Sequence, residues 1–380
     1  MQDDLMAFGE RAARDLGKPS CCGPSPTRDT REMPGYRLCG YVASFTETPA
    51  GKVPVVKTRL DGSDHLGGLA VRCNLRRSRY AVAPGLYAVG SPSDTSPVLV
   101  TANYKLSFDA VRRALDGMDA WLLAADTQGV NVWCAAGKGT FSAGEVAGRV
   151  KASRLAEVVT HRRLILPQLS ASGVTAREMK TRCGFAADFG PVRAWDLPRF
   201  IEAGGCAEPA MRRVTFSLKE RLVLSPVELS LTFKPLVWML PVLFLLSGIG
   251  PGVFSFSQAL ERGPVAWAAL CTGILAGAVV TPALLPWIPG RAFSLKGCLA
   301  GLACGFPFWV YYRQDLEFGS LLALILWLVA VSSYLAMNFT GATPFTSPTG
   351  VEYEMKRAIP AQVAAMVLGF ILWVAAPFTG

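Results

Sequence analysis

Charged residues become rare in this chain after residue 235. The 145 residues from Leu236 to the end carry six basic and five acidic side chains, whereas the preceding 235 residues carry 32 and 23. A helix of about 20 apolar residues is long enough to cross a bilayer. This division excludes a wholly soluble enzyme, a disordered chain and a disulfide-rich secreted module. The predicted membrane spans are 236–256, 264–288, 292–312, 318–342 and 358–378.

The basic residues beside these spans predict their orientation, because lysine and arginine gather in short loops on the cytoplasmic side of a membrane. Five basic residues precede the first span, four lie in loops on the same side and two lie on the other side. They are, in that order, Arg212, Arg213, Lys219, Arg221 and Lys234; Arg291, Lys296, Lys356 and Arg357; and Arg262 and Arg313. We expect a multi-pass protein of the cytoplasmic (inner) membrane, with its soluble N-terminal domain in the cytoplasm and its C-terminus outside.

The net charge of +10 indicates attraction to anionic lipid rather than a nucleic-acid partner. Basic residues are interspersed with acidic ones along the soluble half, and only Arg76, Arg77 and Arg79 form a cluster. The lipid bilayer is therefore the expected partner of the basic segment, and no nucleic acid is expected.

Apolar runs alternate with amphipathic stretches between residues 97 and 203. This alternation is typical of an α/β fold, here a Rossmann-like parallel sheet with helices on its faces. In such sheets ligands bind beyond the carboxyl ends of the strands. The expected strands are 97–101, 120–125, 164–166 and 185–189. The expected helices are 107–115, 142–153, 175–183 and 197–203, with Ser107 and Ser142 as N-caps and a capping box from Ser142 to Glu145.

The chain as a whole is predicted to have five parts. They are a flexible N-terminal arm (1–34), a β-rich subdomain (35–95), the Rossmann-like domain (96–210), a basic juxtamembrane linker (211–235) and a transmembrane domain of five helices (236–380). The β-rich part is expected to contain strands over 36–45, 53–60, 68–73 and 80–87.

The stretch 129–141 follows a predicted strand and precedes a capped helix. It is not a phosphate-binding loop, because Val132 stands where a glycine is needed and Gly139 follows the lysine in place of serine or threonine. If 132–137 forms a short helix, Cys134 and Lys138 share a face, and both the helix start and the lysine favour a thiolate. A buried cysteine in a tight strand–helix turn explains the same pattern equally well.

The run 131–138, Asn-Val-Trp-Cys-Ala-Ala-Gly-Lys, resembles the signature of the membrane-bound, mercury-methylating corrinoid proteins. The segments 100–112 (Val-Thr-Ala-Asn-Tyr-Lys-Leu-Ser-Phe-Asp-Ala-Val-Arg) and 190–194 (Gly-Pro-Val-Arg-Ala) resemble the corrinoid-binding domain of the corrinoid iron–sulfur protein large subunit. Five membrane spans after that domain are also typical of the first family. The resemblance covers about residues 35–380, with Ser107 standing where relatives often have threonine.

This resemblance implies a base-off cobalamin or related corrinoid between the sheet and a short cap helix over 131–138. It implies that Cys134 is both the catalytic residue and the lower axial ligand of cobalt. Neither His65 nor His161 lies in the Asp-x-His-x-x-Gly pattern with which many corrinoid enzymes place imidazole on cobalt, so a thiolate fills that role. The implied cofactor contacts are Thr101, Ser107, Asn131, Val132, Trp133, Cys134 and Ala194.

The activity implied by the resemblance is a corrinoid-dependent methyltransferase that passes methyl from methyl-cobalt(III) to Hg(II). A thiolate donates more charge to cobalt than imidazole does, so the methyl group leaves as a carbanion equivalent toward a soft electrophile. The chain has no CxxC motif. The resemblance therefore implies re-reduction by a ferredoxin-like protein with two 4Fe-4S clusters, and methylation by a methyl-folate-type donor or its methyltransferase.

Two other functions stay open on the sequence. One is a corrinoid methyl carrier of one-carbon metabolism with mercury as an incidental acceptor. The other is a membrane metal transporter with a soluble sensing domain, although no span carries a vicinal cysteine pair and charge inside the spans is nearly absent. Corrinoid bound to the isolated protein would favour the methyltransferase or the carrier over the transporter.

Overall fold

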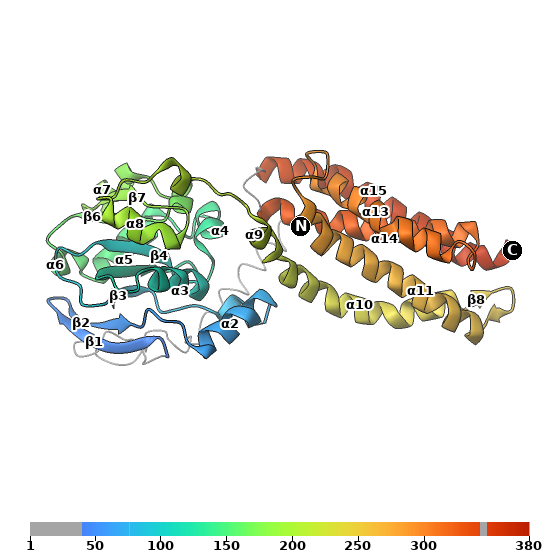
Figure 1. Ribbon diagram of the computed structural model, residues 1–380, viewed down its shortest axis with the longest axis horizontal. Helices are drawn as coiled ribbons and strands as arrows, with labels where there is room; N and C mark the ends of the chain where they lie inside the picture. Colours follow the sequence, from blue (N-terminus) through green and yellow to red (C-terminus); the bar gives the residue numbers. More distant parts are fainter. Residues whose placement is uncertain (1–39, 76, 343–347, 380) are drawn as a thin grey trace. The chain divides into compact units, whose positions relative to one another are not determined.

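The computed structural model describes residues 40–75, 77–342 and 348–379, so the predicted arm over 1–34 lies outside the described residues. Apart from Arg72–Asn74, the chain up to Val214 forms an α/β unit, and the chain from Thr215 onward forms a helical unit. Figure 1 shows both units.

Seven strands form one mixed sheet in the order β1-β2-β3-β5-β4-β6-β7. Strands β5, β4, β6 and β7 run parallel, as predicted, whereas β3 pairs antiparallel with β5 and β1 antiparallel with β2. Strands β3, β4 and β5 are buried along their whole length, which explains why they consist of continuous apolar runs. The strands are β1 Val42–Thr48, β2 Gly51–Val56, β3 Gly85–Val89, β4 Val98–Ala102, β5 Ala120–Ala125, β6 Arg163–Leu166 and β7 Ala186–Phe189.

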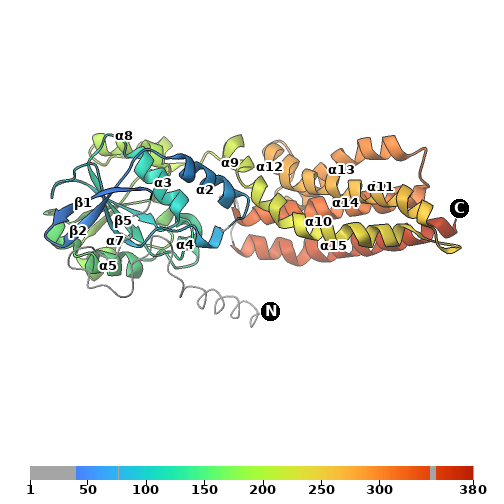
Figure 2. The same ribbon diagram turned by 90° about the horizontal axis from the view of Figure 1, so that it is seen from below.

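Helices cover both faces of this sheet and confirm the predicted α/β fold (Figure 2). One core contains residues of α5 and α7, and the other contains residues of α3 and α8. The helices are α2 Gly62–Arg72, α3 Lys105–Ala114, α4 Val132–Gly137, α5 Ala143–Ala152, α6 Leu155–Val158, α7 Ala176–Cys183 and α8 Leu197–Glu202. The 3₁₀ turns are η1 Arg77–Arg79, η2 Gln168–Ser170, η3 Ala194–Asp196 and η4 Pro209–Arg212.

Two helix starts differ from the predictions. Helix α3 begins two residues before Ser107, with Tyr104 as its N-cap, because Tyr104 pairs with Ala81 and fixes the chain there. Ser142 does cap α5 by accepting a hydrogen bond from the Glu145 amide. The Glu145 carboxylate, however, accepts from the Asp126 amide at 2.8 Å, which ties α5 to the end of β5 instead of closing the capping box.

The strand predicted over 68–73 is wrong, because those residues belong mainly to helix α2. Its buried positions, Asp64, Gly68 and Val71, follow helical spacing rather than alternation. Gly67 allows α2 to pack closely against Tyr80, since a Cβ at this position would lie 2.5 Å from Tyr80 Oη. The other expected strands of the 35–95 segment correspond to β1, β2 and β3 with shifted ends, and all three extend the main sheet.

The helical unit contains five helices that are long and apolar enough to cross a membrane. The long helices are α10 Ser225–Ser247, α11 Phe256–Leu275, α13 Phe293–Tyr312, α14 Phe318–Asn338 and α15 Pro348–Ala375. Shorter elements connect or flank them, namely α9 Leu218–Leu222, β8 Ile249–Gly250, β9 Val253–Phe254, the π-helix η5 Ala276–Val280, α12 Thr281–Leu284, η6 Phe339–Ala342 and η7 Ala376–Phe378.

Helix α14 is the most buried of the five, and glycines bring its neighbours close to it. On α13, a Cβ at Gly297 would lie 2.6 Å from the Ser332 carbonyl oxygen, and one at Gly301 would lie 3.1 Å from Val329 Cα. On α11, a Cβ at Gly273 would lie 2.7 Å from the Leu328 carbonyl oxygen. Small residues at helix contacts let backbones pack closely, which is the main source of stability where lipid provides no hydrophobic driving force.

Arg262 was expected in an outer loop but lies inside α11, where it is nearly fully buried. Its Nη2 donates to the Trp373 carbonyl oxygen at 2.6 Å, and the guanidinium lies 4.2 Å from the centroid of the Trp373 ring. Trp373 Nε1 in turn donates to Ser247 Oγ at 3.2 Å. Arg262 therefore neutralises carbonyl groups at the C-terminal end of α15 and holds this end beside α10.

We expect Gly297→Ala to destabilise the helical unit by about 1–3 kcal/mol, because the added methyl group overlaps Ser332 and Ala336 of α14. Gly319→Ala is the matched control, since a Cβ at that position of the same bundle meets nothing within 4 Å. Thermal unfolding in detergent micelles measures both. Equal stability of the two variants would contradict the close packing of α13 on α14.

Candidate functional site

A cavity of about 340 Å³ lies at the carboxyl ends of β4, β6 and β7, where the parallel sheet predicted a ligand site. Its volume is at the lower end of the range for small-molecule sites, so a larger ligand must also extend over its rim. Its walls are mainly apolar. The lining residues are Leu99, Val100, Thr101, Ser107, Ala110, Val111, Asn131, Val132, Trp133, Ile165, Leu166, Pro167, Leu169, Gly190, Pro191, Val192, Ala194 and Leu197.

Five structural positions bring the predicted contacts together around this cavity. They are the end of β4, the third residue of α3, the N-cap and first turn of α4, and the first residue of η3. The predicted residues that line the cavity are Thr101, Ser107, Asn131, Val132, Trp133 and Ala194. Cys134 is the next residue of α4 and does not line the cavity; it carries a free, exposed thiol.

Two hydroxyl groups in the cavity wall have no hydrogen-bond partner among the described residues. Thr101 is 99% buried, yet neither its hydroxyl nor that of Ser107 forms a hydrogen bond within the described part of the chain. Buried polar groups are almost always hydrogen-bonded, so the Thr101 hydroxyl is available to a ligand with polar substituents, and the partly buried Ser107 hydroxyl lies in the same wall.

The short helix α4 forms as predicted, and its own residues explain why. Asn131 is the N-cap, and its Oδ1 accepts a hydrogen bond from the Cys134 amide at 2.9 Å. Ala135 and Ala136 bury the inner side of the helix, leaving Cys134 on its outer side. The alternative of a buried cysteine in a tight turn is therefore wrong. Asn131 thus has a structural role in addition to lining the cavity.

A buried asparagine, which the sequence analysis did not single out, fixes the loop before α4. Asn103 Oδ1 accepts hydrogen bonds from the Thr127 amide at 3.0 Å, the Thr127 hydroxyl at 2.9 Å and the Gly129 amide at 3.0 Å. These bonds hold Gln128 and Gly129 in left-handed conformations, with φ of 56° and 71°. Polar residues directly after two neighbouring strands were the available signal, since parallel strand ends meet at one edge.

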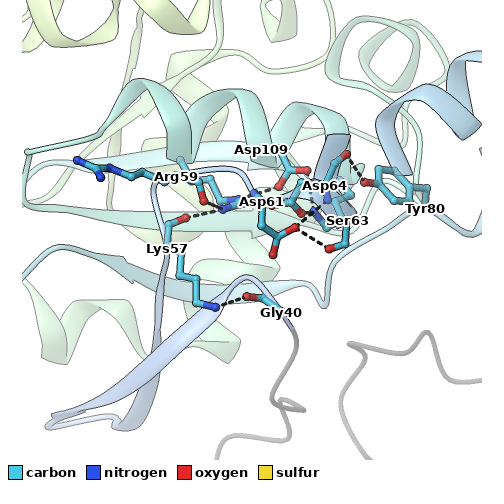
Figure 3. Close-up of polar contacts among 10 residues, drawn as sticks. Gly40, Lys57, Arg59, Asp61, Ser63, Asp64, Tyr80 and Asp109 are labelled. Atoms are coloured by element: carbon cyan, nitrogen blue, oxygen red, sulfur yellow. Dashed lines mark hydrogen bonds and ion pairs between the residues drawn. The ribbon is translucent and has the colours of Figure 1, made fainter. Parts of the chain in front are cut away.

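A cluster of four charged side chains joins α2 to α3, and Figure 3 labels two of them, Asp64 and Asp109. Arg112 is fully buried, and its guanidinium contacts Asp109 at 2.7 Å and Asp64 at 2.6 Å. Lys105 Nζ contacts the same two carboxylates at 2.7 and 2.5 Å. Arg112 also donates to the Lys57 carbonyl oxygen after β2. The cluster therefore joins α2, α3 and the first strands, and it fixes the start of α3 that carries Ser107.

The cluster perturbs two titratable groups outside the membrane helices. Burial raises the pKa of the Asp64 carboxyl, but hydrogen bonds from Lys105 and Arg112 outweigh this and lower its pKa to about 2. Burial, together with the charges of Asp109 and Asp64, raises the pKa of Tyr80 to about 12. Asp64 is thus ionised in the folded protein throughout the physiological range.

Comparisons with known proteins find similarity in the segment that forms most of the α/β unit. Residues 68–195 match the family described as the CO dehydrogenase/acetyl-CoA synthase delta subunit. Over 131 residues the chain is 32% identical to the acetyl-CoA decarbonylase/synthase complex subunit gamma of Methanopyrus kandleri, covering 34% of this chain and 28% of that protein. It is 35% identical over 130 residues to subunit gamma 2 of Methanosarcina thermophila, covering 33% and 27%.

A third relative, subunit gamma of the same complex from Methanocaldococcus jannaschii, is 34% identical over 116 residues, covering 30% of this chain and 23% of that protein. The chain therefore spans about a quarter of the length of these curated relatives. The matched segment contains strands β3 to β7, α4 and every residue of the predicted site. The segment matched by the family model lies before the five apolar helices.

We expect Asn103→Leu to loosen α4, because three hydrogen-bond donors of its loop lose their buried acceptor. Leaving such groups unpaired costs about 1–3 kcal/mol. Hydrogen exchange of the amides between 127 and 138 should become faster while β4 and β5 stay protected. Gln128→Asn is the matched control, since this exposed residue in the same loop tolerates the left-handed conformation as asparagine. Unchanged exchange in Asn103→Leu would contradict the role of Asn103.

We expect the charge cluster to make the stability of the α/β unit decrease at low pH. The pKa of Asp64 is lower in the folded than in the unfolded chain, so its contribution to stability is complete above pH about 4 and is lost as the pH falls toward 2. Asp64→Asn should cost about 3–5 kcal/mol at pH 7 by leaving buried cations unpaired, and should flatten the stability profile between pH 4 and 2. Urea unfolding at each pH, followed by near-UV circular dichroism, measures this; a profile as steep as that of the parent would contradict it.

Proposed function

We propose that this protein is a membrane-bound, corrinoid-dependent methyltransferase that forms methylmercury from Hg(II). A base-off cobalamin or related corrinoid would extend from the cavity of the α/β unit over its rim, and the exposed Cys134 thiol on α4 would hold its cobalt as the axial ligand. The observation that carries the proposal is the position of Cys134 on the short helix α4. Its thiol is exposed, and the three residues before it in the chain, Asn131, Val132 and Trp133, line the cavity.

The similarity to acetyl-CoA decarbonylase/synthase subunits supports the corrinoid domain. At this coarser level the similarity supports a role for the α/β unit in corrinoid-dependent methyl transfer. The finer assignment to mercury is supported by the resemblance of residues 131–138 to the mercury-methylating family and by the five apolar helices.

The residues around the cavity fit a large, flat ligand with polar side groups. Ala194 has a small side chain at one side of the cavity, and Trp133 and Val132 provide apolar contact. The unpartnered hydroxyls of Thr101 and Ser107 can donate hydrogen bonds to amide groups on the rim of a macrocycle. The two imidazoles lie elsewhere: His65 is on α2, and His161 Nε2 lies 2.9 Å from the Ser96 carbonyl oxygen, before β4.

When bound, the corrinoid supplies a cobalt centre that accepts a methyl group and releases it to an acceptor. Cys134 would offer the cobalt a soft thiolate donor, and such a donor increases electron donation to a metal. Asn131 and Asn103 hold that donor in position, the first by capping α4 and the second by fixing the loop before it. The mainly apolar walls of the cavity limit the access of water to a bound ligand.

Turnover requires electrons and a methyl group from outside this chain. Among the described residues, no group of three or more His, Cys, Asp or Glu could hold a metal ion. We propose a ferredoxin-like protein with two 4Fe-4S clusters as the reductant, and a methyl-folate-type donor or its methyltransferase as the methyl source. The soluble unit would face the cytoplasm of the inner membrane, with the C-terminus outside.

A carrier of one-carbon metabolism, with mercury as an incidental acceptor, is the second candidate. It is favoured by the identity of the relatives, which are subunits of an acetyl-CoA decarbonylase/synthase complex. Both candidates use the same cavity and the same cysteine, so they differ only in the acceptor.

We expect Cys134→Ala to abolish methylmercury formation without unfolding the protein, because an exposed thiol is removed from a helix that Asn131 still caps. The assay uses the full chain in liposomes with corrinoid, the ferredoxin-like partner, a methyl donor and Hg(II), with methylmercury measured by mass spectrometry. Cys206→Ala is the matched control, since Cys206 is also an exposed thiol of the α/β unit. Cys134→His tests whether any ligand suffices or a thiolate is needed.

Absorption spectra of the same samples separate binding from catalysis. The parent and Cys206→Ala should share a band that Cys134→Ala lacks, while all three retain corrinoid. Full methylation by Cys134→Ala would disprove the mechanism. Methyl transfer to other acceptors without methylmercury in the parent protein would favour the carrier.

A further inference from the structure

We propose that the outer face of helix α2 and the basic turn after it bind the surface of an anionic lipid bilayer. This surface consists of Leu66, Leu69 and Leu75 with Arg72, Arg77 and Arg79, and is called the α2 surface below. The inference is independent of the corrinoid function.

The α2 surface is apolar where a soluble helix would be polar. The inner side of α2 buries Asp64, Gly68 and Val71. On the opposite side, Leu66 is 70% exposed and Leu69 is 58% exposed, three residues apart and therefore neighbours on the helix. Leu75, in the turn after the helix, is 62% exposed. Single exposed leucines are common on proteins, but here three of them fall within one short segment of the chain.

Positive charge accompanies these leucines. Arg72 is the last residue of α2, and Arg77 and Arg79 belong to the 3₁₀ turn that follows. None of the three arginines is ion-paired with any residue that the structure describes. The acidic residue in the first turn, Asp64, points inward and is neutralised by Lys105 and Arg112. An apolar face bordered by unpaired arginines is typical of segments that lie in the interface of anionic membranes.

A lipid surface is the occupant that the rest of the chain favours. Five helices of the same polypeptide are apolar enough to cross a membrane, so the α2 surface is permanently tethered to a bilayer. Tethering gives a high effective concentration, and a weak contact is then sufficient. Because Asp64 joins α2 to α3 through the buried charge cluster, binding of α2 would also fix the orientation of the α/β unit at the membrane.

Photo-crosslinking of the full chain tests this proposal directly. The probe is Leu69→p-benzoylphenylalanine, placed in nanodiscs of phosphatidylcholine with or without phosphatidylglycerol. After illumination, mass spectrometry of the peptide identifies what the side chain contacts. We expect a phospholipid adduct that is about fivefold more abundant with phosphatidylglycerol present. The control position is Lys180, an exposed residue on α7, where little lipid adduct is expected.

A charge variant gives a second, independent measurement. Combining Arg72→Gln, Arg77→Gln and Arg79→Gln should lower the adduct at position 69 about fivefold. The matched control removes three exposed charges elsewhere, by Arg113→Gln, Lys151→Gln and Lys180→Gln, and should leave the adduct unchanged. Absence of a lipid adduct at position 69, equal adducts at 69 and 180, or a crosslink to a second copy of the chain would overturn the proposal.

Discussion

The geometry of the candidate site depends on one buried amide. Asn103 follows β4, and its Oδ1 accepts from three donors in the loop that follows the neighbouring strand β5. Without an acceptor at this place, the left-handed residues Gln128 and Gly129 would have no fixed conformation, and α4 would not start at a defined point. The cysteine itself is held by a second asparagine, Asn131, which caps the helix. Two amide side chains thus position the exposed thiol of a six-residue helix, a length that is too short to be stable alone.

The charge cluster under α2 and α3 has a comparable role on the other side of the cavity. Two cations and two carboxylates are removed from water together, so none of them is left unpaired. Because Asp64 comes from α2 whereas the other three come from α3, the cluster makes these helices one rigid body. The cluster therefore links α3, which carries Ser107 in the cavity wall, to α2, which carries the proposed membrane-binding surface. A site for a large cofactor and a fixed orientation at the bilayer would then have a common structural origin.

The sequence predicted most of the parallel sheet because its strands are continuous apolar runs, which only a strand buried on both faces requires. It offered a short helix over 132–137 as a condition and did not identify Asn131 as its N-cap, although an asparagine at that place is a local signal. It failed for α2, where two adjacent glycines resemble a turn or a strand end, although Gly67 is needed for close packing on Tyr80. It also failed for Arg262, because a single arginine beside a proline resembles the end of a membrane span. Its burial depends on carbonyl groups of helices distant in the sequence.

The sequence alone determined that the chain has an α/β half and a half with five apolar helices, because periodicity and the absence of charge are local properties of the polypeptide. It also determined which side chains are available for chemistry, Cys134 above all. Tertiary structure decided that this thiol is exposed rather than buried, and that Thr101, Ser107 and Ala194 line the same cavity as α4. It also decided that Asp64 meets Arg112. These outcomes depend on strand order and on contacts between residues far apart in the chain, for which no local pattern exists.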